Sequence, residues 1–396
     1  MDLKNIEKLD QQYFMPVFGQ RLPVAFETGE GACLYDNAGK KYTDFLAGIA
    51  VNSLGYSDEG FKNAIKAQAD KLLHTSNYFY NEPQARLAEA LCGKTGMKGK
   101  VFFGNSGAEA NECAIKLAKK YAYNKRKGSA EFVSVSNSFH GRTLATLTAT
   151  GQDSFHIPFT PGTYEYTYID ANDMNAARAA VTPKTCGVIV EVIQGEGGII
   201  PLDFEYLKLL EKLCKDNDAL LIADEIQTGM GRTGKFLACE HAGLKPDIVT
   251  LAKALGNGVP IGACIAADKA AEAFVQGDHG STFGGNYLAC AAGLYVVGAV
   301  DNAMMEAVAE KGAYFKSKLE GLKDKKPDTI VDVRGMGLLL GAELSAAKNA
   351  AEVKMSMLEK GFVIGTAGQN TLRFVPPYVI EKNDIDDLAE ALIEVL

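Results

Sequence analysis

The chain has 396 residues, of which 47% are hydrophobic and 23% charged, and its formal net charge is −8. These are ordinary values for a globular protein, and the length suffices for a large core in two lobes of one compact unit. The acidic balance argues against a nucleic-acid partner, because such partners require a basic surface. The eight cysteines include no C-x-x-C pair and the five histidines show no ligand spacing, so we expect neither a disulfide framework nor a metal.

The amino terminus carries charged residues where a signal peptide needs an apolar core. The longest apolar stretch, residues 287–300, is too short to span a bilayer. We therefore expect a cytoplasmic protein that has no membrane partner.

In chain order, turn residues separate the apolar runs 32–35 and 41–45, which predicts a small antiparallel hairpin. Helical periodicity follows over 58–73, and Glu82-Pro83 opens a helix that runs to about Leu91. The expected strands of the middle section are 100–103, 131–136, 187–192, 219–223, 247–251 and 261–266, and the expected helices are 108–123, 172–180 and 203–217. A long helical section over 286–323 is followed by strands and a helix at 331–343, 347–360, 362–366 and 371–375.

Apolar runs that alternate with helices predict an α/β fold with a mostly parallel central sheet covered by helices. In such sheets, ligands bind beyond the carboxyl ends of the strands. Most of the residues singled out below are expected at such ends.

The strand expected at 247–251 is followed by Lys253 and a glycine-broken turn. Burial at a strand end makes an ammonium costly and lowers its pKa, which leaves the nucleophilic amine that Schiff-base chemistry needs. The alternative is a lysine that extends from the strand end into solvent, as most lysines do.

Two further turns follow expected strands. Residues 104–111 open a helix, whose free backbone N–H groups suit a phosphate, although many such turns bind nothing. In the next turn, Phe139 has the shape to lie flat on an aromatic ring, and Arg142 has the geometry to bind a carboxylate. Simple core packing of Phe139 is the alternative.

Asp224 ends the apolar strand expected at 219–223, where an unpaired carboxylate is expensive and requires a cation. A protonated pyridine nitrogen is one candidate. An Asp-Glu pair can also hold magnesium, but no G-x-x-x-x-G-K-[ST] loop is present. The buried acid, the strand-end lysine and the phosphate-type turn together indicate pyridoxal phosphate.

These motifs resemble those of the class III (subgroup II) pyridoxal-phosphate aminotransferases, and most of all the acetylornithine aminotransferases of arginine biosynthesis. They include Asn105-Ser-Gly-Ala-Glu-Ala-Asn111, Asp224-Glu-Ile-Gln-Thr-Gly and Gly280-Ser-Thr-Phe-Gly-Gly-Asn286. The other matching segments are 44–52, 74–77, 80–83, 139–143, 194–198, 251–256 and 372–377. Ten motifs in the right order extend over nearly the whole chain.

The resemblance implies a fold-type-I transferase with pyridoxal 5′-phosphate as cofactor. It implies an N-terminal segment (1–56) that joins the small domain, a large cofactor-binding domain (57–287) and a C-terminal small α+β domain (288–396). Lys253 is implied to bind the cofactor covalently, and Asp224 to pair with the ring nitrogen. Gln227 is implied to face the 3-hydroxyl edge, and Phe139 to stack on the ring.

The resemblance further implies that backbone at Gly107 and Ala108 binds the phosphate, with Thr282 reaching in from the partner subunit of a homodimer. Four residues are implied to bind substrate. Arg142 and Ser281 meet the acylated end of N-acetylornithine, Arg373 binds the α-carboxylate of glutamate, and Glu196 screens Arg373.

The implied reaction moves the terminal amino group of N2-acetylornithine to 2-oxoglutarate, giving N-acetylglutamate 5-semialdehyde and glutamate. Rivals are ω-aminotransferases for succinylornithine, ornithine, 4-aminobutyrate or succinyl-diaminopimelate, and a non-catalytic protein that retains the pocket. The sequence departs from the family pattern at Gly55-Tyr56-Ser57-Asp58-Glu59, at Glu191-Val192 and at Asn286-Tyr287. These departures bear on local backbone shape and leave the expected chemistry unchanged.

Overall fold

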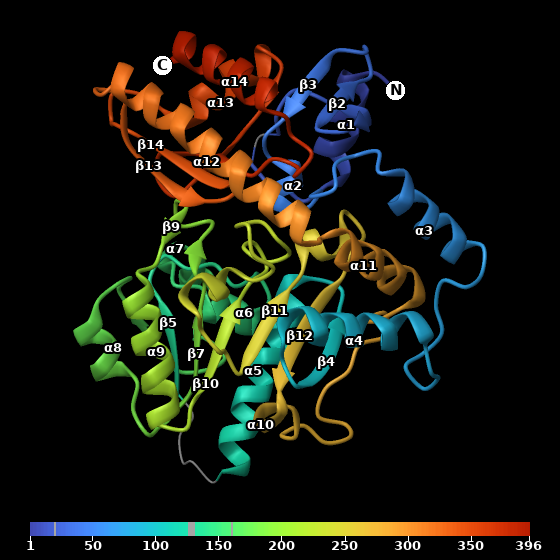
Figure 1. The fold of residues 1–396 in the computed structure, drawn as a ribbon, viewed down its shortest axis with the longest axis vertical. Helices are drawn as coiled ribbons and strands as arrows, with labels where there is room; N and C mark the ends of the chain where they lie inside the picture. The colour runs from blue at the N-terminus through green and yellow to red at the C-terminus, as the bar shows by residue number, and fades with distance from the viewer. Residues whose placement is uncertain (20, 126–130, 160) are drawn as a thin grey trace.

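The computed structural model describes residues 1–19, 21–125, 131–159 and 161–396. A seven-stranded central sheet organises the fold (Figure 1). In spatial order its strands are β4 (Gly99–Gly104), β12 (Gly262–Ala267), β11 (Ile248–Leu251), β10 (Leu220–Asp224), β7 (Thr185–Val190), β5 (Glu131–Val135) and β6 (Tyr166–Ile169). β12 runs antiparallel to both neighbours, and the other pairs are parallel. The expected mostly parallel sheet is therefore confirmed.

The middle strands of this sheet are covered on both faces, which explains their continuous apolar sequences. In β10, Leu221 and Ala223 share one core with α9 (Phe204–Asp216), whereas Leu220 and Ile222 share another with α5 (Gly107–Asn124). Successive side chains of a strand point to opposite faces, so α5 and α9 cover opposite sides of the sheet.

The ends of two helices are fixed by their capping residues. Ser106 caps α5 by accepting a hydrogen bond from the Glu109 N–H at 3.2 Å, so the helix begins directly after β4. Asn81 caps α4 (Glu82–Thr95), which has proline in its first turn and ends at Gly96 in a left-handed conformation.

A second, antiparallel sheet lies in the C-terminal part. Its order is β13 (Ile330–Met336), β14 (Leu339–Leu344), β17 (Thr371–Phe374) and β16 (Gly365–Ala367). The helices of this part are α12 (Asn302–Lys325), α13 (Ala350–Glu359) and α14 (Lys382–Val395). A separate four-stranded sheet contains the N-terminal strands β1 (Phe26–Glu30), β2 (Cys33–Asp36) and β3 (Lys41–Asp44). Its fourth strand is β15 (Phe362–Val363) of the C-terminal part, which pairs in parallel with β3. Figure 1 shows both chain ends in the part of the molecule above the central sheet.

The remaining elements are short or peripheral. The helices are α1 (Leu3–Tyr13), α2 (Ala47–Ala50), α3 (Glu59–Ala69), α6 (Leu144–Ala149), α7 (Asp153–His156), α8 (Met174–Ala180), α10 (Asp268–Ala271) and α11 (Tyr287–Ala299), with 3-10 turns at Ile157–Phe159, Ala238–Ala242 and Lys253–Gly256. A two-stranded ribbon joins β8 (Ile193–Gln194) and β9 (Ile200–Pro201).

The expected hairpin over 32–45 is confirmed, and the expected strands of the middle section match observed strands within a few residues. The long helical section expected over 286–323 is helical, and it consists of two helices, α11 and α12. The two helices are bent by 71° relative to each other. The second helix starts anew after the break, where Asp301 caps α12 by accepting a hydrogen bond from the Met304 N–H at 2.8 Å. The strand expected over 331–343 is a hairpin that turns at Gly337, whose φ is +56°. The sequence reading also missed β6, whose polar and apolar residues alternate, and the terminal helices α1 and α14.

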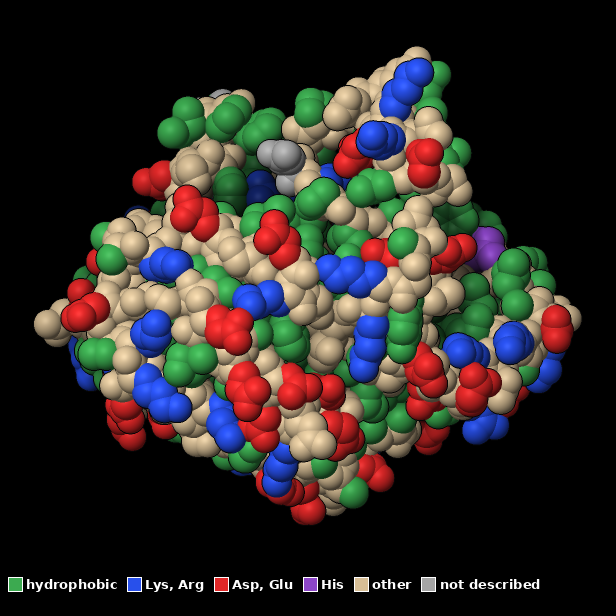
Figure 2. All heavy atoms as spheres, turned by 90° about the horizontal axis from the view of Figure 1, so that it is seen from above, with side chains coloured by type: hydrophobic (Ala, Val, Ile, Leu, Met, Phe, Trp, Pro, Cys, Tyr) green, Lys and Arg blue, Asp and Glu red, His purple; other side chains and the backbone are tan. Residues whose placement is uncertain are grey.

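The outer face seen in Figure 2 carries acidic and basic side chains interspersed among apolar ones. Among the described residues, no single helix is long and apolar enough to cross a membrane. The bent pair α11 and α12 reaches the required length and composition only when both helices are taken together.

Candidate active site

A cavity of about 400 Å³ lies where several strands of the central sheet end. Its wall is formed by the first turn of α5, by residues 139–142 after β5, by Asp224, Ile226 and Gln227 at the end of β10, and by Lys253 after β11. Parallel strands bring the residues that follow them to one edge of the sheet, which explains why segments far apart in sequence meet here. Val51 and Glu196 complete the wall from other parts of the chain.

Lys253 follows β11 and starts a 3-10 turn in a left-handed conformation, with φ of +44°. A non-glycine residue rarely adopts this conformation, and such strain is concentrated at functional sites. Burial lowers the pKa of the Lys253 amine to about 8, although the Glu196 carboxylate opposes this effect and the Arg373 guanidinium adds to it. A substantial fraction of the amine is therefore unprotonated at mildly alkaline pH and available as a nucleophile.

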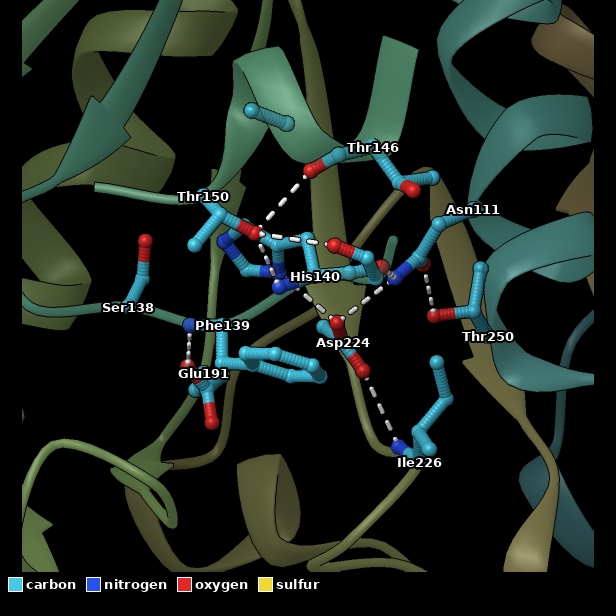
Figure 3. A network of polar contacts seen from close by, with 12 residues as sticks. Asn111, Ser138, Phe139, His140, Thr146, Thr150, Glu191, Asp224, Ile226 and Thr250 are labelled. Carbon is cyan, nitrogen blue, oxygen red and sulfur yellow. Dashed lines mark hydrogen bonds and ion pairs between the residues drawn. The ribbon is translucent and has the colours of Figure 1, made fainter. Parts of the chain in front are cut away.

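Asp224 stands at the centre of a buried polar network (Figure 3). Its Oδ2 accepts hydrogen bonds from Asn111 Nδ2 at 2.8 Å and from His140 Nδ1 at 2.7 Å, and its Oδ1 accepts the Ile226 N–H at 3.1 Å. An ionised carboxylate only accepts, so the His140 proton lies on Nδ1. Thr250 Oγ1 in turn donates to Asn111 Oδ1 at 2.8 Å and fixes the amide orientation.

His140, Asn111 and Thr250 were not predicted as site residues, although His140 and Asn111 lie within segments that match the family pattern. A histidine directly after Phe139 and an asparagine on the buried face of α5 were the available signals.

Glu196 and Arg373 form an ion pair at one side of the cavity. Glu196 lines the cavity, and Arg373 lies behind it in β17 with only 4% of its surface exposed. Burial alone would raise the pKa of Glu196, but the charges of Arg373 and Lys253 hold it below its usual range. Gln227 Nε2 also donates to Glu196 Oε1, at 3.4 Å. The structure thus brings together Glu196, Arg373, Gln227 and Lys253, as the resemblance implies.

Phe139 lines the cavity, and Arg142 lies exposed at its mouth with its guanidinium 5.4 Å from the centre of the Phe139 ring. The Arg142 guanidinium also lies 3.8 Å from the Phe155 ring centre. Both distances lie within the range of cation–π contact, so the two rings hold the guanidinium near the opening.

Ser281 and Thr282 lie outside this cavity in the single chain. Both line a second cavity of about 980 Å³, and Thr282 is exposed. Ser281 is connected to the first cavity through Asn105, whose Nδ2 donates to Ser281 Oγ at 3.3 Å and which lines the first cavity itself.

A phosphorylated pyridine ring fits this cavity on three observations. The buried Gln227 Oε1 has no hydrogen-bond partner in the described structure, which leaves an acceptor for a ring hydroxyl. Asp224 faces the cavity with a carboxylate held by the Asn111 amide and the His140 imidazole, a site for a protonated ring nitrogen. The amides of Gly107 and Ala108 lie in the first turn of α5, where N–H groups lack intrahelical acceptors and favour a phosphate. A Cβ at Gly107 would approach Ile226 Cδ1 to 2.8 Å, so glycine is required for this close packing.

A strand-end lysine, a buried acid and a helix N-terminus on this sheet define a fold-type-I enzyme dependent on pyridoxal phosphate. A family model described as "Aminotransferase class-III" matches residues 14–396. The chain belongs to the class-III aminotransferase family, and its cofactor is pyridoxal 5′-phosphate.

The chain is 48% identical to an acetylornithine aminotransferase from Methanocaldococcus jannaschii, with 100% of this chain and 98% of the relative covered. Among solved structures, an ornithine aminotransferase from Toxoplasma gondii with partial occupancy of PLP at its active site superposes with a TM-score of 0.94. It is 33% identical, over 99% of this chain and 94% of that one. An N-acetylornithine aminotransferase from Stenotrophomonas maltophilia gives a TM-score of 0.84 at 34% identity, over 98% and 97% of the two chains.

Proposed function

We propose that the protein transfers the terminal amino group of N2-acetylornithine to 2-oxoglutarate, yielding N-acetylglutamate 5-semialdehyde and glutamate, as an aminotransferase (EC 2.6.1.-) of arginine biosynthesis. The observation that carries this proposal is the Glu196–Arg373 pair beside the Lys253 amine. One pocket must accept a terminal amine on a neutral stem and then glutamate, which has a carboxylate at the same position. An arginine that is masked and unmasked by a carboxylate meets both needs, because a bare buried cation beside a neutral stem is costly.

The cofactor, when bound, supplies an aldehyde that takes up the amino group and a protonated ring that withdraws electrons. Lys253 would hold it covalently, and its amine would move a proton at the substrate carbon that carries the nitrogen. Asp224 holds the ring nitrogen protonated, and Asn111 and His140 keep its carboxylate in place. Phe139 packs on the ring face, and Gln227 accepts from the 3-hydroxyl group.

We further propose that Arg142, with Ser281, binds the acylated amino-acid end of the substrate. Its exposed position at the mouth of the cavity supports this role, since the acyl group extends away from the reacting amine. Arg373 binds the α-carboxylate of glutamate after the Glu196 side chain swings away.

The active unit is proposed to be a homodimer in which Thr282 reaches the phosphate held by Gly107 and Ala108 of the other subunit. Support comes from the exposed apolar side chains around Thr282: Tyr78 is 95% exposed, and Phe79 and Phe283 are 66% and 60% exposed. Asn77 donates to the carbonyls of Ser281 and Gly284 at 3.1 Å each, which joins the two loops into one patch. A contiguous exposed apolar patch is typical of a subunit interface, and two-fold dimers are the commonest.

We also propose that the enzyme is cytoplasmic, has no nucleic-acid or membrane partner, and is divided into segments 1–56, 57–287 and 288–396. The pairing of β3 with β15 supports the association of the first segment with the last.

A panel of amino donors with 2-oxoglutarate as acceptor tests the proposed substrate. The donors are N2-acetylornithine, succinylornithine, ornithine, 4-aminobutyrate and succinyl-diaminopimelate, with pentylamine as the donor that lacks a carboxylate. We expect the highest kcat/KM for N2-acetylornithine. Arg142→Gln should reduce its advantage over pentylamine by about tenfold or more, since a hydrogen-bonded charge pair contributes roughly 1.5–3 kcal/mol. A higher kcat/KM for another donor of the panel would overturn the substrate assignment.

A further inference from the structure

Glu191 joins two segments of the cavity wall through its carboxylate. It directly follows β7 and is only 6% exposed. Its Oε1 accepts the Phe139 N–H at 2.9 Å, and its Oε2 accepts the Gly195 N–H at 3.1 Å. Figure 3 shows the first of these bonds, with Glu191 beside the backbone of Phe139 and the Phe139 ring toward Asp224.

Each of the two amides belongs to a segment that carries a residue of the proposed machinery. Phe139 itself lines the cavity, and His140 next to it donates to Asp224. Gly195 precedes Glu196, the partner of Arg373. The Glu191 carboxylate therefore links the segment that contains Phe139 to the turn that contains Glu196 and fixes the distance between them.

The backbone of the Glu196 turn is held on both sides. Before it, the Gly195 N–H is bound to Glu191. After it, the Glu196 carbonyl accepts the Gly368 N–H at 2.8 Å. The turn is also closely packed, because a Cβ at Gly195 would lie 2.2 Å from Gln227 Oε1. Because the backbone is fixed in this way, the displacement of Glu196 that unmasks Arg373 is confined to the Glu196 side chain.

We infer that Glu191 is a positioning residue that fixes the Glu196 turn, and thereby determines how fully Glu196 masks Arg373 in the acetylornithine half-reaction. This inference rests on the proposed function, since it assigns the anchor of the switch that the proposal gives to Glu196. A purely structural role is the alternative, and Glu225 shows what such a role looks like. Glu225 is 1% exposed and accepts the N–H groups of Ala238 and Cys239 at 3.0 and 2.7 Å, but neither it nor those amides line the cavity.

Burial raises the pKa of Glu191 to about 7, with the nearby Asp224 carboxylate adding to this effect and His140 opposing it. Burial also raises the pKa of Glu225, so the two carboxylates differ in what they bind: the amides held by Glu191 belong to segments that line the cavity. The two bonds of Glu191 need an acceptor oxygen at each of two positions, which a carboxylate supplies and an amide side chain, with one oxygen and one NH₂ group, does not.

Glu191→Gln tests the inference with Glu225→Gln as the matched control. Glutamine keeps one acceptor, but its NH₂ group faces the other N–H, so one of the two bonds is lost. In the holoenzyme, hydrogen exchange of the peptides that contain Phe139 and Gly195 should accelerate by about tenfold in at least one of them. In Glu225→Gln the acceleration should occur at Ala238 and Cys239 instead.

Single-turnover rates of the two half-reactions give the second measurement. Glu191→Gln should slow the acetylornithine half-reaction more than the glutamate half-reaction and shift their ratio about threefold to tenfold. Glu225→Gln should leave the ratio unchanged. In a Glu196→Ala background, Glu191→Gln should no longer alter the ratio, since the group it positions is gone. Glu191→Asp, which keeps the charge but cannot reach both amides, replaces Glu191→Gln if the latter does not fold.

The outcomes separate the inference from the proposal beneath it. If Glu196→Ala shifts the ratio and Glu191→Gln does not, the role of Glu191 is structural and the inference is overturned. If Glu196→Ala itself leaves the ratio unchanged, the role proposed for Glu196 is wrong and the inference falls with it. A shift by Glu191→Gln that persists without Glu196 also overturns the inference.

Discussion

Replacing Lys253 by methionine is expected to stabilise the cofactor-free protein at neutral pH. Burial lowers the pKa of the Lys253 amine from the ordinary 10.5 to about 8. At about 1.4 kcal/mol for each pH unit, this shift corresponds to roughly 3 kcal/mol for holding the ammonium in the fold. That figure is an upper value, because the Lys253 side chain borders an open cavity. Methionine retains the apolar stem and removes the charge.

The stabilisation should depend on pH with a defined sign. Below pH 8 the amine is protonated in both the folded and the unfolded chain, so the full penalty is present. Between pH 8 and 10.5 the unfolded chain binds a proton that the folded chain has lost, so the wild type gains stability with rising pH. The advantage of Lys253→Met therefore narrows across this window and disappears above it.

Thermal unfolding of the cofactor-free proteins between pH 7 and 10.5 measures this difference. We expect Lys253→Met to unfold several degrees above the wild type at pH 7 and close to it at pH 10.5. Lys66→Met, at an exposed position of α3, is the control, since it removes a charge without relieving burial. A variant no more stable than the wild type at pH 7, or a gap that stays constant with pH, would refute the reasoning.

Three further predictions concern the site. Glu196→Ala should slow the acetylornithine half-reaction about tenfold or more, roughly 1.4 kcal/mol, and strengthen the glutamate half-reaction, as single-turnover spectra would show; equal changes in both would contradict the masking role. Asn111→Ala removes a donor to Asp224 and should weaken cofactor binding about tenfold in a fluorescence titration, whereas an unchanged Kd would exclude that role. Sedimentation should find a dimer, and an active monomer at assay concentrations would contradict the shared site. Thr282→Val should lower the affinity for the cofactor while the protein remains a dimer.

The sequence predicted the strand ends at Asp224 and Lys253 because local patterns carry that information: an apolar run interrupted by one charged residue. It did not predict the bond between His140 and Asp224, which are 84 positions apart. Neither periodicity nor composition encodes which two strand ends become neighbours. The same holds for Glu191, whose contact with the Phe139 amide depends on the register of β7 against β5.

Tyr56 shows how a departure from the family pattern acquires a structural reason. Its hydroxyl donates to Asp44, a buried carboxylate that also accepts the N–H groups of Leu46 and Ala47. Burial raises the pKa of Asp44, and these donors oppose the effect. They hold a left-handed turn over Ala47–Ala50 directly before Val51, which lines the cavity. Beyond Gly48, no local pattern predicts this turn, because its left-handed non-glycine residues are imposed by tertiary contacts.

Reduction of the purified protein with borohydride, followed by peptide mass mapping, tests the central claim most directly. The account predicts a yellow protein whose reduced cofactor is attached to a single residue, Lys253, with the mass of a pyridoxyl phosphate group. Attachment to a different lysine, or a protein that retains no cofactor after reduction, would contradict the account.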